Sequence, residues 1–362
     1  MQHFHSLQVA SVDPLTRNAV VLSFDVPAEL ADTFRYRQGQ HITLRTDVDG
    51  EEVRRSYSVC SAVQEARLRV AVKRVDGGVF SNWVNDGLEA GAHVAVLPPA
   101  GHFMVDLDAD NAKHYVAFAA GSGITPILSI VKTTLMAEPR SRFTLFYGNR
   151  SASSVLFKEE LEDLKDRYLD RFRLVFILSR EELDIDLFHG RLDRERVAAL
   201  LGAWVDPADI DAAFVCGPLD MMTGVREALQ AGGVARKKIK LELFATSVTD
   251  ASRRQASRRT QASAAAQGLC EVSVVLDGRT RVFSAPKGNG SLLDAALDEA
   301  VELPYSCKSG VCSSCRCKLT AGEVDMGAAY ALEDYEIERG FVLACQSHAI
   351  SDRVTLDFDQ ET

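Results

Sequence analysis

Four cysteines in one short stretch of the chain could hold a metal centre. Residues 305–317 read YSCKSGVCSSCRC, so four cysteines fall within eleven positions. Zinc and iron both bind thiolates, but they favour different spacings. Structural zinc sites usually take two C-x2-C pairs separated by a longer loop. Iron–sulfur clusters of the plant type take C-x4-C-x2-C and a distant fourth cysteine.

The spacing in this chain favours an iron–sulfur cluster. Cys307, Cys312 and Cys315 give C-x4-C-x2-C, and Cys345 follows after twenty-nine further residues. The sequence contains no second C-x2-C pair that could supply the other half of a zinc site. Small residues between the cysteines would let backbone N–H groups approach the sulfurs and tune the reduction potential. We therefore expect these four cysteines to ligate a 2Fe–2S cluster, and Cys317 to be a small buried residue.

Two stretches near the start of the chain could together hold a flavin nucleotide. In RRSYSV (54–59), Arg55 could pair with a phosphate, and Tyr57, two residues later on the same strand face, could stack on a planar ring. In AVKRVDGGVFSNWV (71–84), a Gly-Gly turn leads into a helix that we expect to begin near Ser81. The N–H groups and dipole of such a helix start suit a pyrophosphate. Alone, RRSYSV would fit an exposed strand edge, but together the stretches predict a flavin lying along a barrel.

A third set of residues is typical of a dinucleotide site. AAGSGITP (119–126) follows a buried strand and opens a helix, although two glycines alone would also fit a tight structural turn. Later strands end in YGNR and LSRE, which would put Arg150 and Arg180 at the carboxyl ends of strands, where nucleotides bind. The pair Ser179–Arg180 would suit the 2′-phosphate of NADPH, with surface ion pairs as the alternative. A fourth strand ends in CGP (216–218) and would face the same crevice.

The chain divides by pattern into three folded regions and a linker. Residues 1–106 hold short alternating runs such as LRVAVKRV, which predict an antiparallel barrel. Residues 107–244 alternate apolar strands with helical stretches, which predicts a doubly wound parallel sheet. Residues 245–268 combine small residues with arginine pairs and predict a flexible linker. Residues 269–362 open with a strand pair and a helix before the cysteine loop.

Charge and composition limit the partners of this chain. Its net charge is −10, and residues 269–362 carry sixteen acidic and eight basic side chains. So acidic a module argues against nucleic acid and suits docking on a basic protein surface, although solubility alone explains it equally well. No stretch resembles a signal peptide or a membrane span. Cysteines without paired spacing are typical of the reducing cytoplasm, so we expect a soluble cytoplasmic protein that binds neither nucleic acid nor membrane.

In their order along the chain, these motifs resemble a known family. R-x-Y-S, G-S-G-I-T-P, C-G-P and C-x4-C-x2-C followed by a distant cysteine are similar to the ferredoxin–NADP reductase superfamily with a C-terminal plant-type ferredoxin. The stretches FHSLQVA, GQHITL, YGNR, LSREELD, HGRLD and GVCSSCRCKLTAGEVDM further resemble the reductase subunits of phenylacetyl-CoA epoxidases. The resemblance covers the chain outside the linker. It implies a multi-domain fold with an antiparallel FAD-binding barrel, a doubly wound NADP-binding sheet and a β-grasp ferredoxin.

The resemblance also implies which residues hold the cofactors. FAD, rather than FMN, would be held by residues of the barrel, and Ser58 would lie near the flavin N5. The FAD-binding residues would be Arg55, Tyr57, Ser58, Val72, Gly78, Phe80 and Ser81. NADPH would be held by the nucleotide domain: Gly121, Ser122, Gly123, Thr125, Arg150, Ser179, Arg180 and, beside the nicotinamide, Cys216, Gly217 and Pro218. Glu242 and Phe244 would lie near the opposite flavin face. In many relatives the reductase ends with an aromatic residue over the flavin, whereas here Phe244 continues into the linker.

The implied function is electron transfer. The resemblance predicts a reductase that takes electrons from NADPH through FAD and a 2Fe–2S cluster to the multi-subunit di-iron oxygenase that epoxidises phenylacetyl-CoA. Hydride transfer needs no acid or base from the protein, so we expect no catalytic residues. Two alternatives stay open: a reductase for another partner, such as a steroid or aromatic-ring hydroxylase or a hybrid-cluster protein, and an electron carrier or redox sensor without turnover.

Overall fold

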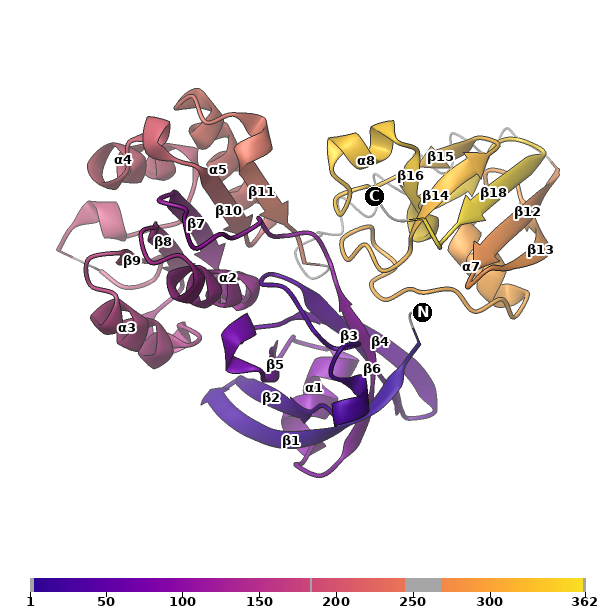
Figure 1. Cartoon of the computed structure of the whole chain (residues 1–362), viewed down its shortest axis with the longest axis horizontal. Coiled ribbons are helices and arrows are strands. Elements are labelled where there is room, and N and C mark those ends of the chain that lie inside the picture. The colour runs from indigo at the N-terminus through magenta and orange to yellow at the C-terminus, as the bar shows by residue number, and fades with distance from the viewer. Residues whose placement is uncertain (1–2, 183, 245–267, 361–362) are drawn as a thin grey trace. The chain divides into compact units, whose positions relative to one another are not determined.

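The computed structural model of the chain describes residues 3–182, 184–244 and 268–360 (Figure 1). It contains two compact units, one formed by His3–Glu242 and the other containing Leu243–Thr362. The predicted linker, 245–268, lies outside the described residues except for its last glycine.

The first part of the N-terminal unit is an antiparallel barrel. Its strand order is β4-β3-β6-β1-β2-β5, and every pair is antiparallel. An antiparallel bridge between Val59 and Val70 joins the end of β4 to β5 and closes the sheet. One helix, α1, packs against it. The bounds are β1 (His5–Thr16), β2 (Ala19–Asp25), β3 (His41–Val48), β4 (Glu51–Ser58), β5 (Leu68–Lys73), α1 (Val79–Gly87) and β6 (His93–Ala100).

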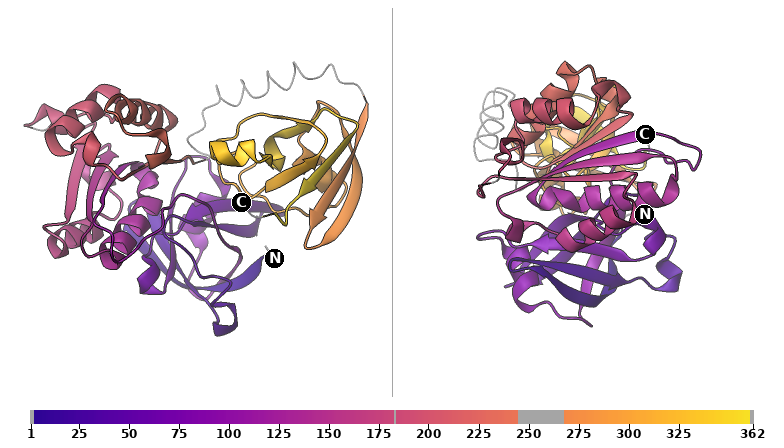
Figure 2. Two further views of the ribbon diagram at one scale, coloured as in Figure 1. Left: turned by 45° about the horizontal axis from the view of Figure 1, so that its top comes forward. Right: turned by 90° about the vertical axis from the view of Figure 1, so that its left-hand side faces the viewer.

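The second part of this unit is a parallel sheet with the order β11-β10-β7-β8-β9. The chain starts at the central strand β7, extends to β9, and returns to the other side of β7, so the sheet changes direction between β7 and β10. Helices α2 and α3 lie on one face and α4 and α5 on the other (Figures 1 and 2). The bounds are β7 (His114–Ala120), α2 (Ile124–Ala137), β8 (Arg142–Asn149), α3 (Lys158–Arg167), β9 (Phe172–Leu178), α4 (Arg194–Trp204), β10 (Ala212–Cys216), α5 (Leu219–Ala231) and β11 (Ile239–Glu242).

Buried polar contacts join the barrel to the parallel sheet. The hydroxyl of Ser129 on α2 donates to the carbonyl of Ser61 at 2.7 Å. The ammonium of Lys132, also on α2, pairs with Glu65 of the barrel and with Glu160 of α3. A buried ammonium with two carboxylates around it fixes the relative positions of the three segments.

The C-terminal unit is a small mixed sheet with short helices. Its main sheet has the order β13-β12-β18-β14-β16, in which β12 and β18 are parallel and the other pairs antiparallel, and a separate pair joins β15 to β17. Helix α7 packs on β13, and an apolar core fills the space between them. The bounds are β12 (Leu269–Leu276), β13 (Arg279–Pro286), α7 (Leu292–Asp298), β14 (Arg316–Ala321), β15 (Val324–Met326), α8 (Asp334–Glu338), β16 (Phe341–Leu343), β17 (Ser347–Ala349) and β18 (Arg353–Asp357).

These sheets confirm the predicted fold class of barrel, doubly wound sheet and small mixed α+β module. Among the described residues, no helix combines the length and the apolar character needed to cross a lipid bilayer.

Candidate functional site

An aromatic platform lies where β4 meets α1. The Tyr57 ring is 5.8 Å from the ring of Phe80, which in turn is 5.5 Å from Trp83 in an edge-to-face arrangement. Phe80 is buried and Tyr57 is half-buried, and burial raises the pKa of the Tyr57 hydroxyl. Arg55, two residues before Tyr57, is exposed. Phe80 packs against the Tyr57 ring, and the guanidinium of Arg55 is accessible nearby. This arrangement fits a flavin that stacks on Tyr57 and whose phosphate is bound by Arg55.

The N-terminus of α1 supplies a tight turn beside this platform. The helix begins at Val79, two residues before the predicted start, with Gly78 as its N-cap. A Cβ on Gly78 would lie 2.6 Å from Oγ of Ser81 and 2.9 Å from the Cβ of Val75, so the close packing of this turn favours glycine. That hydroxyl accepts a hydrogen bond from the Val75 N–H at 3.0 Å and donates to the Gly78 carbonyl at 3.2 Å. The N–H groups of the first helical turn have no partners within the helix, so they can bind a pyrophosphate.

Val72 is part of the barrel core behind this site. Its side chain is completely buried in the barrel core, and its carbonyl accepts a hydrogen bond from the Asn85 amide at 3.2 Å. Val72 therefore supports the strand and helix of the flavin site from inside. A direct contact with FAD stays a prediction.

The two turns at the change of direction of the parallel sheet touch each other. Residues 121–123 follow β7, and a Cβ on Gly123 would overlap the carbonyl oxygen of Cys216 at the end of β10. Gly121 has φ +54°, a conformation that glycine adopts without strain, and its carbonyl accepts a 2.9 Å hydrogen bond from the Tyr147 hydroxyl. Thr125 donates to the Ser122 carbonyl at 3.1 Å. The GSG and CGP motifs thus form one backbone surface at the place where doubly wound sheets bind dinucleotides.

The second of these turns leads directly into a helix. Pro218 is the N-cap of α5, and a Cβ on Gly217 would lie 3.2 Å from the Cβ of Ala120. The turn is therefore packed against the end of β7, beside the start of the GSG motif.

A buried carboxyl joins the barrel to this surface. The Ser58 hydroxyl, at the end of β4, donates to Oε1 of Glu242 at 3.2 Å. In the register of the parallel strands β10 and β11, Glu242 lies opposite Cys216. Oε2 of Glu242 is inaccessible to solvent and has no partner among the described residues. Burial raises the pKa of Glu242 to about 8, and the hydrogen bond from Ser58 lowers it. Burial and the neighbouring Glu242 raise the pKa of the Cys216 thiol.

Cationic residues from both parts of the unit lie near the ends of β8 and β9. The Arg180 N–H donates to the Arg150 carbonyl at 2.9 Å, and Ser179 N–H donates to the Asn149 carbonyl at 2.9 Å. Both arginine side chains are exposed. Lys73 at the end of barrel strand β5 is half-buried, and burial together with the charge of Arg150 lowers its pKa. Two cations that repel each other favour a bound phosphate between them. Sequence reasoning missed Lys73, although it stands in the quoted AVKRV stretch.

The cysteines of the C-terminal unit converge in two pairs. The Cys307 and Cys312 thiols are in contact, as are those of Cys315 and Cys345. The Ser309 N–H points at the Cys307 sulfur at 3.4 Å, and the Cys307 N–H points at the Cys312 sulfur at 3.5 Å. Backbone donors aimed at sulfur suit thiolates that carry negative charge in a cluster.

The cysteine loop is tightly wrapped. A Cβ on Gly310, which has φ +76°, would overlap the carbonyl oxygen of Ala328. The amide of Gln346 donates to the Lys308 carbonyl at 3.2 Å and lies 3.7 Å from the Cys345 sulfur. Cys317 is buried in the core, with its sulfur 3.9 Å from the Val342 carbonyl, as a small core residue would be. In the described part of the chain, no group of three or more His, Cys, Asp or Glu side chains is placed to hold a single metal ion.

Helix α8 is anchored to the cysteine loop. Arg316, directly after Cys315, forms an ion pair of 2.8 Å with Glu336, whose side chain is 1 % exposed. The Arg316 guanidinium also lies 4.6 Å from the centre of the Phe341 ring. These contacts fix the position of α8 relative to the backbone that carries the cysteines.

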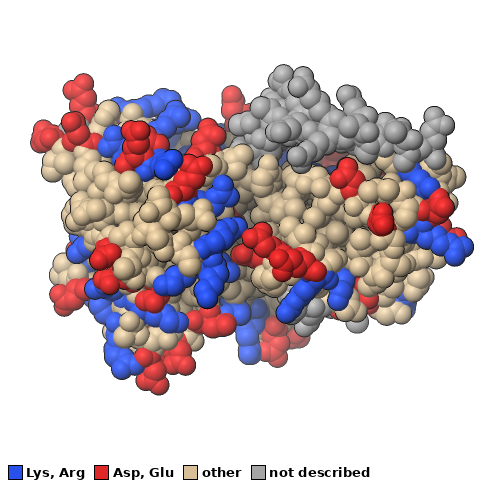
Figure 3. All heavy atoms as spheres, turned by 90° about the horizontal axis from the view of Figure 1, so that it is seen from above, with Lys and Arg blue, Asp and Glu red and all other residues tan. Residues whose placement is uncertain are grey.

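Charged side chains of both signs lie on the surface of the N-terminal unit. On the face shown in Figure 3, basic side chains lie among acidic ones on the N-terminal unit. On α8 the side chains of Asp334 and Glu338 are exposed next to Tyr335 and Ile337, each 43 % exposed.

Phe244, the last residue described before the linker, is half-buried.

Three protein-family models match the chain in succession. They are an oxidoreductase FAD-binding domain at residues 6–105, an oxidoreductase NAD-binding domain at residues 118–227, and a 2Fe–2S iron–sulfur cluster binding domain at residues 274–349. These matches confirm the predicted FAD, NAD(P) and 2Fe–2S modules and their order.

Curated relatives and a solved structure span the whole chain. One subunit of the 1,2-phenylacetyl-CoA epoxidase of Escherichia coli is 43 % identical over 99 % of this chain and 99 % of its own length. The ferredoxin reductase component of the 3-ketosteroid-9-alpha-monooxygenase of Mycolicibacterium smegmatis is 37 % identical over 99 % and 98 %. The solved structure of phthalate dioxygenase reductase aligns with a TM-score of 0.59 and 26 % identity, covering 98 % of both chains.

Proposed function

Because the chain belongs to the ferredoxin–NADP reductase superfamily, among the reductases with a C-terminal 2Fe–2S domain, we propose that it is the reductase subunit of a phenylacetyl-CoA epoxidase. In this role it takes electrons from NADPH and delivers them to a multi-subunit di-iron oxygenase in the cytoplasm. Its 43 % identity to the Escherichia coli protein over nearly the full length of both chains supports this partner above others.

The observation that carries the proposal is the meeting of three motifs within the N-terminal unit. Ser58 of the barrel bonds to Glu242, and Glu242 is paired with Cys216, whose carbonyl touches the GSG turn. A flavin ring on Tyr57 and a nicotinamide at Cys216 would therefore be close to one another. A non-catalytic carrier has no need of a dinucleotide surface next to its flavin.

The residues of the chain position and shield the cofactors. Bound FAD would accept a hydride from NADPH and supply electrons one at a time to a 2Fe–2S cluster. Tyr57, Arg55 and the start of α1 would hold the flavin, and the turns at Gly123 and Cys216 would orient the nicotinamide. The Glu242 carboxyl, protonated at neutral pH, can donate a hydrogen bond into the site. We propose Cys307, Cys312, Cys315 and Cys345 as the cluster ligands.

We infer a preference for NADPH from the cations near the ends of β8 and β9. Arg150, Arg180 and Ser179 are brought together by backbone hydrogen bonds between adjacent strand ends. Guanidinium groups bind phosphates bidentately, and NADH lacks the 2′-phosphate.

We further propose that α8 and its flanks dock on the oxygenase. Tyr335, Ile337 and Tyr330 are exposed apolar side chains among exposed acidic ones, and the Ala331 N–H donates to the carbonyl of Gly310 in the cysteine loop at 3.0 Å. A partner face with apolar and basic residues would complement this surface. Oxygenase-dependent turnover should weaken with rising ionic strength, whereas ferricyanide reduction should not. Turnover indifferent to salt would contradict electrostatic docking.

The proposed function is tested with purified oxygenase subunits. NADPH consumption and epoxide formation are measured with and without phenylacetyl-CoA, and cytochrome c reduction is followed in parallel. Epoxide formed only when all components are present supports the assignment. Reduction of cytochrome c without any loss of phenylacetyl-CoA would show that the electron path is right and the partner wrong. Steroid oxygenase components are the next partners to assay, given the 37 % identity to a reductase of that class.

A further inference from the structure

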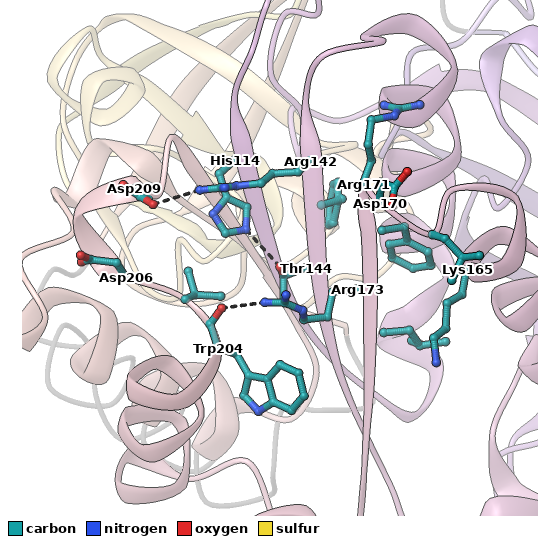
Figure 4. Close-up of a pocket in the computed structure, with 15 residues that line it drawn as sticks. His114, Arg142, Thr144, Lys165, Asp170, Arg171, Arg173, Trp204, Asp206 and Asp209 are labelled. Carbon is teal, nitrogen blue, oxygen red and sulfur yellow. Dashed lines mark hydrogen bonds and ion pairs between the residues drawn. The ribbon is translucent and has the colours of Figure 1, made fainter.

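A pocket of about 500 Å³ lies at the starts of β7, β8 and β9 (Figure 4). Its lining includes the buried side chain of His114 and two arginines. Arg142 pairs with Asp209 at 2.9 Å, and Arg173 donates to the Trp204 carbonyl at 2.9 Å. Both arginines are thus partnered within the protein, so we assign no ligand to this pocket.

A different cation, Lys308, lies in the cysteine loop directly after the proposed ligand Cys307. Its φ is +50°, a left-handed conformation that glycine adopts without strain and a residue with a Cβ does not. The Ser309 N–H that follows this turn points at the Cys307 sulfur at 3.4 Å. The backbone here would be less strained with glycine. The presence of lysine therefore indicates that its side chain is used.

Both the backbone and the charge of Lys308 are held in place. Its ammonium pairs with Asp294 of α7 at 2.8 Å and lies 5.0 Å from the centre of the Tyr305 ring. Its carbonyl accepts a hydrogen bond of 3.2 Å from the amide of Gln346, the residue after Cys345. The cation is therefore fixed next to the loop that carries the proposed cluster ligands.

Asp294, the partner of this lysine, is fixed as well. The Ser291 hydroxyl at the N-cap of α7 donates to its carboxylate at 2.7 Å and accepts its N–H at 3.1 Å. Burial alone would raise the pKa of Asp294, but hydrogen bonds from Lys308 and Ser291 lower it, so the carboxylate is ionised at neutral pH. The side chains of Lys308 and Asp294 are 44 % and 52 % exposed, and so exposed an ion pair contributes little to stability. What remains is the electric field of two fixed charges at the cysteine loop.

We propose that the Lys308–Asp294 pair sets the reduction potential of the 2Fe–2S cluster, an inference that rests on the proposed assignment of the four cysteines as its ligands. Reduction transfers one electron to the cluster, whose charge becomes more negative by one unit. The Lys308 cation stabilises this added charge and raises the potential, whereas the Asp294 carboxylate destabilises it and lowers the potential. The pair thereby sets how readily the cluster accepts an electron from the flavin.

The proposal is tested by the midpoint potential of the cluster in the full-length holoprotein. The protein is titrated with dithionite at pH 7, and the reduced cluster is followed by EPR. Lys308→Gln should lower the midpoint, and Asp294→Asn should raise it. In each variant the ratio of reduced to oxidised cluster at the wild-type midpoint should change about threefold or more, equal to about 28 mV for a one-electron couple. Lys308→Arg keeps the charge and should keep the wild-type midpoint.

The sign of the two shifts separates a charge effect from a loss of packing. Lys308→Gln and Asp294→Asn break the same contact, so a packing effect would move both midpoints in the same direction, whereas a charge effect moves them in opposite directions. The matched control is Arg279→Gln, which removes a positive charge from the exposed first residue of β13, at the opposite end of that strand from the segment leading to α7. Its midpoint should equal that of the wild type.

Three results would overturn the proposal: shifts of the same sign, an unmoved midpoint in Asp294→Asn, and an equal shift in Arg279→Gln. Asp294 lies outside the cysteine loop, so Asp294→Asn and Lys308→Arg decide the question even if Lys308→Gln assembles no cluster. A wild-type protein without any 2Fe–2S signal is a separate outcome, because it would overturn the proposed function itself.

Discussion

The Ser58 hydroxyl donates a hydrogen bond of 3.2 Å to Oε1 of Glu242, a residue 184 positions further along the chain. The bond joins the end of a barrel strand to the end of β11, beside Cys216. It ties the predicted flavin site to the predicted nicotinamide site through one carboxyl. The position of that carboxyl depends on both parts of the N-terminal unit.

We expect the Glu242 carboxyl to be protonated at neutral pH. Burial raises its pKa to about 8, so infrared difference spectra should show a protonated carboxyl band that disappears with a midpoint near pH 8. The band should be missing from Glu242→Gln. A Glu242 carboxylate that is fully ionised at pH 6 would contradict this assignment.

The same shift affects stability. The folded pKa of Glu242 lies above the ordinary value of 4.5, so the native state binds the extra proton and loses stability as pH rises from that value through about 8. Glu242→Gln cannot ionise, and its free energy of unfolding should exceed that of the wild type by at least about 1 kcal/mol at pH 8.5. The difference should vanish below pH 4.5, where both side chains are neutral. Urea denaturation across this pH range measures it.

Gly123→Ala should weaken NADPH binding. The new Cβ would overlap the Cys216 carbonyl, so the GSG and CGP turns must separate. We expect KM for NADPH to rise about tenfold or more, equivalent to about 1.4 kcal/mol, with FAD retained. Gly202→Ala on α4 is the matched control, because a Cβ there meets no atom within 4 Å. Equal KM values for the two variants would show that the contact between the turns has no part in binding.

Removing the cations near the ends of β8 and β9 should change coenzyme preference. The double variant Arg150→Gln, Arg180→Gln should lower kcat/KM for NADPH about tenfold or more and leave that for NADH nearly unchanged, because a guanidinium–phosphate contact contributes about 1.5–3 kcal/mol. Steady-state ferricyanide reduction with each coenzyme measures the ratio. A parallel loss with both coenzymes would assign these arginines to another role.

The ion pair between α8 and the cysteine loop should stabilise the C-terminal unit. Glu336→Gln leaves the largely buried Arg316 without its carboxylate and should cost about 3 kcal/mol of unfolding free energy. Glu338→Gln, on the exposed side of the same helix, should change it by less than about 0.5 kcal/mol. Urea unfolding followed by loss of the visible cluster absorbance compares the two. Similar midpoints would mean that the pair contributes no net stability.

Local patterns in the sequence were sufficient to predict the sheets and several turns. Alternation in LRVAVKRV marked β5, and the change to strand–helix alternation marked the parallel sheet, because each pattern follows the period of its own backbone. We also expected the CGP turn to face the same crevice as the GSG turn, as the topology of a doubly wound sheet implies, and in the structure the two turns touch.

Features that depend on distant side chains could not be predicted in the same way. The unpartnered oxygen of Glu242, the closeness of Lys73 to Arg150 and the pocket at His114 each depend on how separate segments pack. The side chain of Val72 lies inside the barrel core, and its contact with the flavin stays a prediction. Strand periodicity predicts on which face of the sheet a side chain lies, but not which residues of other segments pack against it.

The most direct test of the account is the EPR spectrum of protein reduced anaerobically with NADPH. Wild type and Cys317→Ala should both give the signal of a reduced 2Fe–2S cluster, because Cys317 lies in the core with its sulfur near the Val342 carbonyl. Cys345→Ala, which offers no ligand atom, should lack that signal while NADPH still bleaches the flavin absorbance. A full cluster signal in Cys345→Ala, or none in the wild type, would contradict the proposed path of electrons from NADPH through the flavin to the four cysteines.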